Sequence, residues 1–319
     1  MNWAYQSGTA LTAVLMIFSI EPLSSQPLSL SSGGIFRDCA DCPEMIVIPG
    51  GNFLMGSDRK EQMRDKELRP EGPIRPVTFA KPFAAGRFEV TNAEYAAFVV
   101  ATGYNATNGC VTSGGRYAVD GVNWRNPGIG TDVADDEPVV CVDWTDAKAY
   151  TLWLAGHTGL PYRMLTEAEW EYAAKAGSAA VWPWGSDENQ ICEHGNVFDQ
   201  SGLGDPRSKI GTNAAATAAA CDDGFQTIAP VGQFKPNAFG LYDTIGNVWE
   251  WAEDCSFMLY SDEPVDGSAH QASGVCEKRA VRSGSWRTRV SRHRPTFRGR
   301  DPADLAYFMF GFRLARDLN

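Results

Sequence analysis

Apolar side chains recur at helical spacing in three segments between residues 91 and 176. In the first segment, Thr91 and Glu94 form a capping-box pattern, and Tyr95, Phe98 and Val99 follow on one helical face. In such a box, the hydroxyl and the carboxylate each accept a hydrogen bond from a backbone N–H that the first helical turn leaves unpaired. The pattern therefore predicts a helix that begins after Thr91.

Two further helices are predicted over residues 144–156 and 166–176. In the former, apolar side chains return every three or four residues along one face. In the latter, Thr166 and Glu169 repeat the capping box immediately ahead of Trp170. We interpret both boxes as helix starts and not as functional motifs.

The rest of the chain has the pattern of short strands and turns. Residues 45–55 place two apolar runs around a Pro-Gly-Gly turn, which predicts a β-hairpin, and residues 76–90 carry a further strand pattern. Residues 57–76 are rich in charge and proline, so we expect an exposed loop. After residue 177 we expect short strands and irregular loops, including residues 200–224. The sequence thus predicts an α+β fold with little regular secondary structure.

The N-terminus indicates export. Residues 1–20 carry no charged side chain, and residues 10–20 form an apolar run of the length of a signal-peptide core, too short for a comfortable membrane span. We expect a signal peptide over residues 1–25, a linker over residues 26–43 and a domain over residues 44–319. The missing Lys or Arg at the start leaves a mis-assigned start or a membrane anchor as alternatives. No second apolar run reaches 18 residues, so we expect a periplasmic or secreted protein without a membrane span after signal removal.

The composition narrows the possible classes of protein. With 39 Asp and Glu against 28 Lys and Arg, the net charge is −11, which disfavours nucleic-acid binding. The 32 glycines and 18 prolines disfavour a helical bundle. The sequence has no Gly-rich phosphate loop and no Gly-x-Ser-x-Gly motif. Its four histidines, at positions 157, 194, 270 and 293, lack the spacing of an iron or zinc site.

Eight cysteines suit an oxidising compartment. Sequence alone leaves many pairings open, and the economical hypothesis is local pairing. The Cys-x-x-Cys at 39–42 could instead be a redox pair or half of a zinc site, although no second such motif and no nearby histidine supports zinc. The expected bridges are Cys39–Cys42, Cys110–Cys141, Cys192–Cys221 and Cys255–Cys276.

Several phrases follow one another in an order that resembles one family. They are MIVIPGGNFLMGS (45–57), RFEVTNAEYAAF (87–98), PVVCVDWTDAKAY (138–150), YRMLTEAEWEYAAKAG (162–177), PWG (183–185), DDGFQTIAPVGQFKPNAFGLYDTIGNVWEW (222–251), RSGSW (282–286) and GFRLAR (311–316). This chain resembles the sulfatase-modifying-factor family, whose founding member is the formylglycine-generating enzyme. The resemblance covers about residues 44–316 and implies a single domain related to the C-type-lectin fold.

The resemblance implies two calcium sites. Residues 243–250 place two carboxylates seven positions apart around a glycine turn, and calcium takes several oxygen ligands, including backbone carbonyls. The alternative is that these carboxylates are ordinary turn and strand residues. One implied site uses the side chains of Asp243 and Glu250 with the carbonyls of Gly246 and Val248. The other uses the side chains of Asn196 and Asp223 with the carbonyls of Val197 and Phe225.

The family's copper site is missing. In the formylglycine-generating enzyme, two cysteines five apart follow the Gly-Ser-aromatic phrase and bind copper(I). Here those positions hold Thr288 and His293, and copper(I) prefers soft thiolates. We therefore expect no copper and no formylglycine formation. Ser285, Thr288 and His293 are the catalytic candidates. Ser285 matches a family active-site serine, and the alternative is that it is a turn hydroxyl.

A cluster of arginines surrounds these positions. Such a cluster can bind a carboxylate, sulfate or phosphate, or it can pair with the excess acidic groups of the fold itself. We expect the second role for Arg298 and Arg313, which family members commonly carry. A peptide or an anionic small molecule is the partner that the cluster suggests. Its members are Arg287, Arg289, Arg292, Arg294, Arg298 and Arg300.

Two functions follow as expectations. The first is an exported oxidoreductase-type relative that acts on a peptide or peptide-derived substrate without the copper mechanism. The ergothioneine-synthesis branch is excluded, because its His-rich helical domain is absent from this sequence, whereas the branch linked to siderophore maturation stays open. The second is a non-catalytic, calcium-stabilised binding module of lectin-like fold.

Overall fold

The computed structural model describes Met1 and residues 31–318, apart from residues 63–67, 114, 116, 131–132, 205–216, 258–259, 261–263, 272–273 and 275. The predicted signal peptide lies outside the described residues, as do residues 26–30 of the predicted linker. Residues Ser31–Asn319 form one compact unit, which agrees with the expected α+β domain. In the described part of the chain, no helix is both long and apolar enough to cross a membrane.

The N- and C-terminal parts of this unit share a five-stranded antiparallel sheet. Its order is β1-β2-β7-β16-β10, so the last strand of the chain lies between two earlier ones. The strands are β1 (Ile35–Phe36), β2 (Met45–Ile48), β7 (Phe83–Gly86), β16 (Leu314–Asp317) and β10 (Tyr162–Met164).

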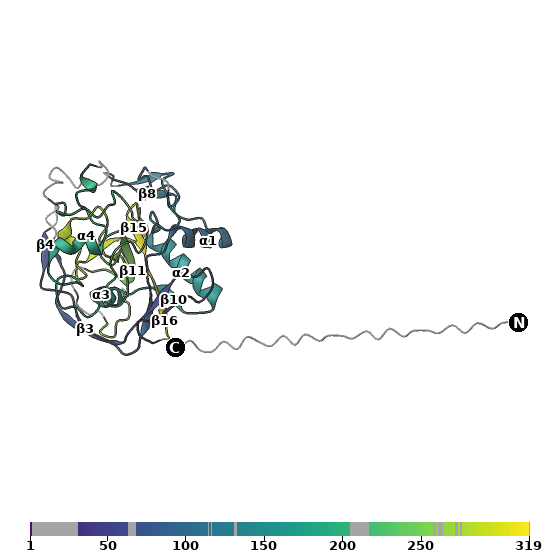
Figure 1. Ribbon diagram of the computed structural model, residues 1–319, viewed down its shortest axis with the longest axis horizontal. Helices are drawn as coiled ribbons and strands as arrows, with labels where there is room; N and C mark the ends of the chain where they lie inside the picture. The colour runs from purple at the N-terminus through teal and green to yellow at the C-terminus, as the bar shows by residue number, and fades with distance from the viewer. Residues whose placement is uncertain are drawn as a thin grey trace. The chain divides into compact units, whose positions relative to one another are not determined.

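A four-stranded sheet lies near the middle of the ribbon and carries the segment with the strongest resemblance (Figure 1). Its order is β13-β12-β11-β15, with β11 antiparallel to β12 and parallel to β15. The strands are β11 (Trp249–Cys255), β12 (Lys278–Arg282), β13 (Gly299–Pro302) and β15 (Phe310–Phe312).

Three smaller sheets complete the strands, and two of them correct predictions. The charge-rich segment expected to be a loop instead contains a hairpin, because β4 (Lys60–Gln62) pairs with β5 (Leu68–Pro70). The β-hairpin predicted over residues 45–55 is wrong, because its two runs join different sheets. Strand β2 pairs with β1 and β7, whereas β3 (Gly51–Met55) pairs with β6 (Arg75–Phe79). The third sheet has the order β14-β8-β9, with bounds Ala306–Tyr307, Gly109–Val111 and Ala118–Asp120.

All three predicted helices form, each behind a capping box. They are α1 (Asn92–Thr102), α2 (Trp144–Thr158) and α3 (Glu167–Lys175). The boxes at Thr91 and Thr166 are confirmed, and Asp143 with Asp146 makes a third that we did not predict. After residue 177, the described helices are a single turn, α4 (Ile191–His194), and short 3-10 turns at Glu188–Gln190, Gly202–Gly204 and Val290–Arg292.

Residues 31–43 of the predicted linker pack onto the domain. Strand β1 pairs with β2, and Phe36 is buried. Asp38 accepts hydrogen bonds from Arg316 and Tyr162. The folded unit therefore begins more than ten residues before the boundary that the motifs suggested, because the family phrases do not include this edge strand.

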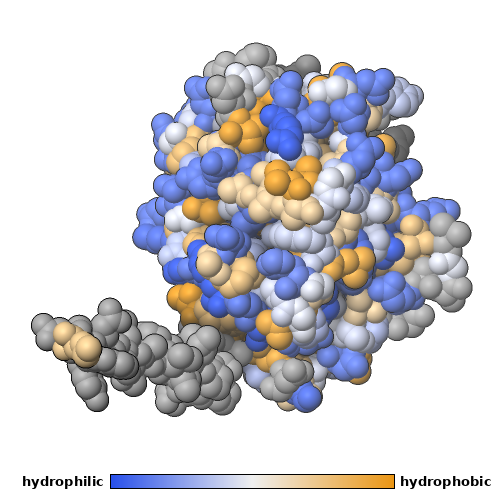
Figure 2. Space-filling model, turned by 90° about the vertical axis from the view of Figure 1, so that its right-hand side faces the viewer, coloured by the Kyte–Doolittle hydropathy of each residue, from blue (hydrophilic) through white to orange (hydrophobic). Residues whose placement is uncertain are grey.

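All four predicted disulfides are present, and they involve all eight cysteines. Three of them close loops of 21 to 31 residues. Such closure stabilises a domain by about 3–4 kcal/mol in the chain-entropy estimate. On the face that Figure 2 shows, hydrophobic side chains occur in small groups among hydrophilic ones, which is the ordinary surface of a folded domain.

Candidate functional site

The two segments expected to bind calcium lie against each other. The Asn247 N–H donates to the Asn196 carbonyl over 2.8 Å, and the Asn196 side-chain amide donates to Asn247 Oδ1 over 3.2 Å. Gly246 adopts φ +88°, and a Cβ there would lie 2.0 Å from the Asn196 carbonyl oxygen. The glycine is therefore required, because only a residue without a side chain fits this approach.

Around Asp223 the structure gathers oxygen atoms that could ligate a cation. The carboxylate accepts the N–H of Val197 over 2.8 Å and that of Phe225 over 2.9 Å. Asn196 Oδ1 is buried and has no hydrogen-bond partner among the described residues. Burial raises the pKa of Asp223 to about 7, and the neighbouring Asp199 adds to this rise. A buried carboxylate beside an unpaired amide oxygen is a good environment for a hard cation.

The sequence reasoning missed Asp199 at this site. A carboxylate oxygen of Asp199, one of Asp223 and the Cys192 sulfur lie within 4.8 Å of one another. Because the sulfur is in the bridge to Cys221, only the two carboxylates can act as ligands. Asp199 is fully buried and accepts the Asp223 N–H. Asp199 lies close to Asp223 because of the disulfide and the fold of the intervening segment, so the spacing of the two residues in the sequence does not indicate a site.

The Phe225 carbonyl of this site is already engaged. It accepts a hydrogen bond from the Ser201 hydroxyl over 2.7 Å. A carbonyl oxygen has two lone pairs, so this contact does not prevent it from binding a cation as well.

The second site surrounds Asp243. One carboxylate oxygen accepts the Gly232 N–H over 2.7 Å, while the other is buried and has no hydrogen-bond partner among the described residues. Asp243 is at φ +56°. Burial raises its pKa to about 6, because the Gly232 N–H and Arg313 compensate only part of the burial and of the Glu250 charge.

The other expected ligands of this site, Glu250, Gly246 and Val248, are less available to a cation. Arg313 binds both oxygens of Glu250, with contacts of 2.8 to 3.2 Å. Trp170 also donates to Glu250, over 2.7 Å. The Gly246 carbonyl accepts the Ser283 hydroxyl over 2.9 Å, and Val248 is fully buried. Glu250 therefore anchors Arg313 and contributes to the site mainly through its charge.

Glu89 is the residue that completes this cluster, and the sequence reasoning missed it. Its side chain is buried, and neither carboxylate oxygen has a hydrogen-bond partner among the described residues. The nearest guanidinium nitrogen, from Arg313, is 3.9 Å away. Burial and the Asp243 charge raise the pKa of Glu89 well above its usual value. A charged residue within the apolar stretch before Thr91 was the available signal.

These observations test whether calcium fits. Both clusters leave buried oxygen atoms unpaired, from Asn196 in one and from Asp243 and Glu89 in the other. All are hard oxygen donors of the type that calcium prefers, whereas soft or redox-active metals prefer nitrogen and sulfur. The described residues therefore fit calcium at both places.

The three catalytic candidates form one buried cluster. The Ser285 N–H donates to Thr288 Oγ1 over 3.0 Å, and the two hydroxyl oxygens are also 3.0 Å apart. His293 Nε2 lies 2.8 Å from the Thr288 carbonyl oxygen. Ser285 and His293 are fully buried, and Thr288 is 7% exposed. The positions of the copper cysteines therefore hold a hydroxyl and an imidazole that close a turn.

His293 is neutral in this setting. Burial lowers its pKa to about 4, against the hydrogen bonds with the Thr288 and Ser283 backbone. A Cβ on Gly284 would lie 2.3 Å from the imidazole, so the glycine makes room for the ring. A buried neutral imidazole bonded to the chain cannot act as a proton shuttle at neutral pH without first becoming accessible.

Much of the arginine cluster pairs internally. Arg298 binds Glu167 and Arg313 binds Glu250, as predicted. Arg292 binds Glu61 over 2.8 Å, and Arg294 binds Glu71. The surrounding acidic groups therefore compensate these four arginines, which leaves less of the cluster for an external anion.

Comparison with known proteins agrees with this architecture. Residues 32–318 match the sulfatase-modifying factor enzyme 1-like domain. The formylglycine-generating enzyme of Thermomonospora curvata is 32% identical over 86% of this chain and 93% of its own length. The inactive C-alpha-formylglycine-generating enzyme 2 of Bos taurus is 31% identical over 97% of this chain and 96% of its own.

A solved structure extends the comparison to three dimensions. PvdO from Pseudomonas aeruginosa superposes with a TM-score of 0.72 at 37% sequence identity, over 90% of this chain and 99% of that one. The family match over residues 32–318 includes the calcium candidates and the Ser285–Thr288–His293 cluster. This chain belongs to the sulfatase-modifying-factor family.

Proposed function

We propose that this chain is an exported member of the family that acts on a peptide or peptide-derived substrate without a copper-thiolate centre. The observation that carries the proposal is the closed turn of Ser285, Thr288 and His293 at the position of the family's cysteine pair. No cysteine of the chain is free. Copper(I) therefore has no thiolate to bind, while the family fold around the position is kept.

The relatives support this substrate class. Several of them generate formylglycine, which is an amino-acid derivative, and this chain shares their domain over nearly its full length. Export is supported by the four disulfides, which form and persist in oxidising compartments.

Calcium is the cofactor of this proposal, in a structural role. Asn196, Asp223 and Asp199, with the carbonyls of Val197 and Phe225, would hold one ion. The other ion would be held by the side chains of Asp243 and Glu89 and the carbonyls of Gly246 and Val248. Glu250 would add its negative charge nearby. Bound calcium supplies positive charge to carboxylates that the protein alone leaves uncompensated.

The test of the missing copper chemistry uses a Cys-x-Pro-x-Arg peptide. We expect no conversion to formylglycine after aerobic incubation with copper and a thiol reductant, as measured by mass spectrometry. The double variant Thr288→Cys with His293→Cys should gain copper(I) binding, because it restores two soft thiolates at the family spacing. The matched control, Thr288→Ser with His293→Asn, should not. Turnover by the unmodified protein would contradict the proposal.

A non-catalytic, calcium-stabilised binding module is the second candidate. It is favoured by the burial of all three candidate side chains and by the similarity to an inactive relative. Metal analysis of the purified protein together with oxygen uptake on peptide substrates separates the two. Calcium alone, with no oxygen uptake, supports the module, whereas a bound redox metal with uptake supports the enzyme.

A further inference from the structure

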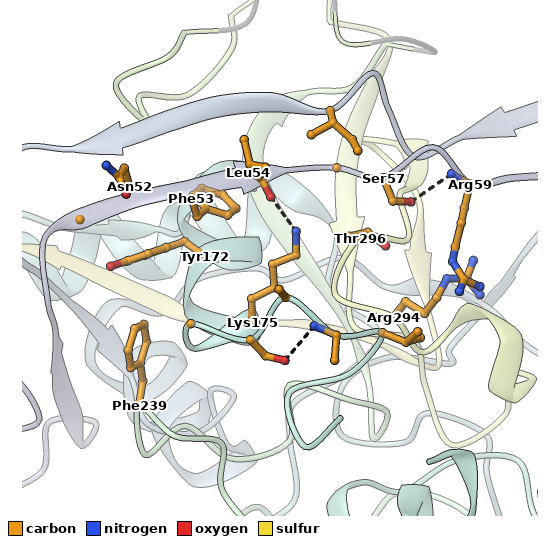
Figure 3. A pocket seen from close by; sticks show the side chains of 18 residues that line it. Asn52, Phe53, Leu54, Ser57, Arg59, Tyr172, Lys175, Phe239, Arg294 and Thr296 are labelled. Atoms are coloured by element: carbon orange, nitrogen blue, oxygen red, sulfur yellow. Dashed lines mark hydrogen bonds between the residues drawn. The ribbon is translucent and has the colours of Figure 1, made fainter. Parts of the chain in front are cut away.

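A cleft of about 700 Å³ lies between strand β3 and the C-terminal end of helix α3 (Figure 3). Residues 51–57 form one wall, residues 172–181 form another, and Arg294 and Thr296 lie at one end. This volume is typical of small-molecule sites. Ser285, Thr288 and His293 are not among its lining residues, so the cleft is separate from that cluster.

One end of the cleft is aromatic. Phe53, Tyr172 and Phe239 gather there in Figure 3. The ring centroids of Phe53 and Tyr172 are 5.2 Å apart, and those of Tyr172 and Phe239 are 5.6 Å apart. Two lining aliphatic residues face solvent, since Leu54 is 61% and Ile74 45% exposed. This end therefore offers flat apolar walls on which an aromatic ring can stack.

The other end is cationic. Arg59 and Arg294 approach each other there, and Lys175 lies between them and the aromatic end (Figure 3). None of the described residues that line the cleft is an aspartate or glutamate, although the whole chain has a net charge of −11. A positive lining in an acidic protein selects for an anionic ligand.

The three cations differ in how they are paired. Lys175 contacts Glu171 and the Leu54 carbonyl, each over 2.8 Å. Arg294 binds Glu71, a buried carboxylate that also accepts hydrogen bonds from Thr296 and Ser57.

Arg59, by contrast, has an exposed side chain whose guanidinium makes no hydrogen bond or ion pair to any described residue. Its backbone N–H donates to the Ser57 hydroxyl, and its carbonyl accepts the Glu71 N–H. One uncompensated positive charge therefore faces the cleft.

We propose that this cleft binds a small amphipathic carboxylate, in which a short chain joins an aromatic ring to the acid. The ring stacks at the end formed by Phe53, Tyr172 and Phe239, and the carboxylate pairs with the Arg59 guanidinium, whose planar fork matches it. A single unpaired guanidinium suits a monoanion better than a phosphate dianion, which would need further free cations. The site does not depend on the proposed oxidative function.

The first test is calorimetric titration of the full chain with 2-naphthylacetate and with its neutral analogue 2-naphthylacetamide. The acid should bind roughly tenfold more tightly than the amide, as expected for one charge-assisted pair. Arg59→Gln should remove this preference without changing the thermal unfolding, because the side chain is exposed. The matched control is Arg125→Gln, an exposed arginine stacked on Trp124 outside the cleft lining, which should leave binding unchanged.

A steric variant tests the location. Ala180 lines the cleft and is exposed, so Ala180→Trp should fill part of it without disturbing the fold. We expect both naphthyl ligands to lose binding in this variant. The proposal is overturned if neither ligand binds the unmodified protein, if acid and amide bind equally, or if Arg59→Gln or Ala180→Trp leaves the affinity for the acid unchanged.

Discussion

Two clusters of buried carboxylates in this molecule differ in how fully arginines neutralise them. In the first, Glu167 and Glu171 meet Arg282, whose nitrogens lie 2.9 and 3.2 Å from their oxygens, and Arg298 adds a contact of 2.9 Å to Glu167. In the second, Arg313 is the one cationic side chain among the described residues that lies beside Glu89, Asp243 and Glu250.

The pKa values follow this balance. Burial alone would raise the pKa of Glu167, but Arg298 and Arg282 outweigh it and lower the value to about 2. In the second cluster, burial and mutual repulsion win, so the pKa of Asp243 rises to about 6 and that of Glu89 also rises. The first cluster is complete within the described protein, whereas the second needs a proton or an added cation. The uncompensated carboxylates of the second cluster are the reason why we propose a metal ion there and none at the first cluster.

The largest effect is expected from breaking the balanced cluster. Arg282→Met leaves Glu171 and Glu167 buried without their shared partner, and the free energy of unfolding should fall by about 3–5 kcal/mol. Denaturant unfolding measures this. The matched control is Arg37→Met, since Arg37 forms a half-exposed pair with Glu44 and should cost about 1 kcal/mol or less. Equal losses in the two variants would contradict the comparison.

The disulfide beside the Asp223 site should have the next largest effect. Replacing Cys192 and Cys221 together by serine opens a loop of 29 residues and should cost about 3–4 kcal/mol. It should also weaken calcium binding, because Asp223 is held near Asn196 by that loop. The Cys255→Ser with Cys276→Ser variant serves as the control, since it opens a loop of 21 residues away from both calcium clusters. A loss of calcium affinity in that control as well would show that the effect is general destabilisation.

Metal removal should destabilise the protein through the two proposed calcium sites, around Asp243 and around Asp223, and not through the Arg282 cluster. Stripping calcium should lower the free energy of unfolding by about 2–3 kcal/mol when the ion was present at 100 times its Kd. Glu89→Gln should reproduce part of this loss and reduce the response to chelator, as measured by thermal unfolding. Glu250→Gln is less specific, because it also loosens Arg313. An unchanged melting curve for stripped protein at several chelator concentrations would contradict both sites.

The smallest effect is a change in pH dependence. The folded pKa values of Asp223 and Asp243, about 7 and about 6, lie above the ordinary value of 3.8. Without metal, the folded state therefore binds more protons than the unfolded state in this range, and stability should fall as pH rises from about 4 to 7.

Calcium should reverse this slope, because the ion takes the place of the protons and binds more tightly as they leave. Glu167, with its lowered pKa of about 2, has the opposite sign, so its stabilisation is lost only below about pH 4. Melting temperatures across this pH range, with and without calcium, test the reversal. If the curves with and without calcium ran parallel, the carboxylates with raised pKa values would not bind the ion.

The parts of the fold that depend on local chemistry could be predicted from the sequence. The capping boxes at Thr91 and Thr166 fix helix starts through neighbouring residues, and they are confirmed. Local pairing of all eight cysteines is confirmed for a similar reason, because short loops close most readily. The pairing of β4 with β5 was missed, since these strands show no alternation of apolar and polar side chains.

The candidate site was predictable only through the resemblance. The predicted Cys192–Cys221 bridge already brings the segments of Asn196 and Asp223 together, but only the resemblance names these two residues as ligands. Glu89 lies more than 150 positions before Asp243, and its unpaired oxygens become visible only when the strands are assembled. Burial and long-range contact decide these roles, and spacing along the chain reports neither.

The pair of hydrogen bonds between Asn196 and Asn247 has a consequence for how the ions would bind. Asn196 belongs to one proposed calcium site, and Asn247 lies between Gly246 and Val248 of the other, while its amide also donates to the Ala229 carbonyl. An ion that orders one segment thereby orders the other, so part of the entropy of ordering is lost only once. The two ions should then bind with positive cooperativity. Reciprocity requires that losing either ion lowers the affinity for the other by the same factor.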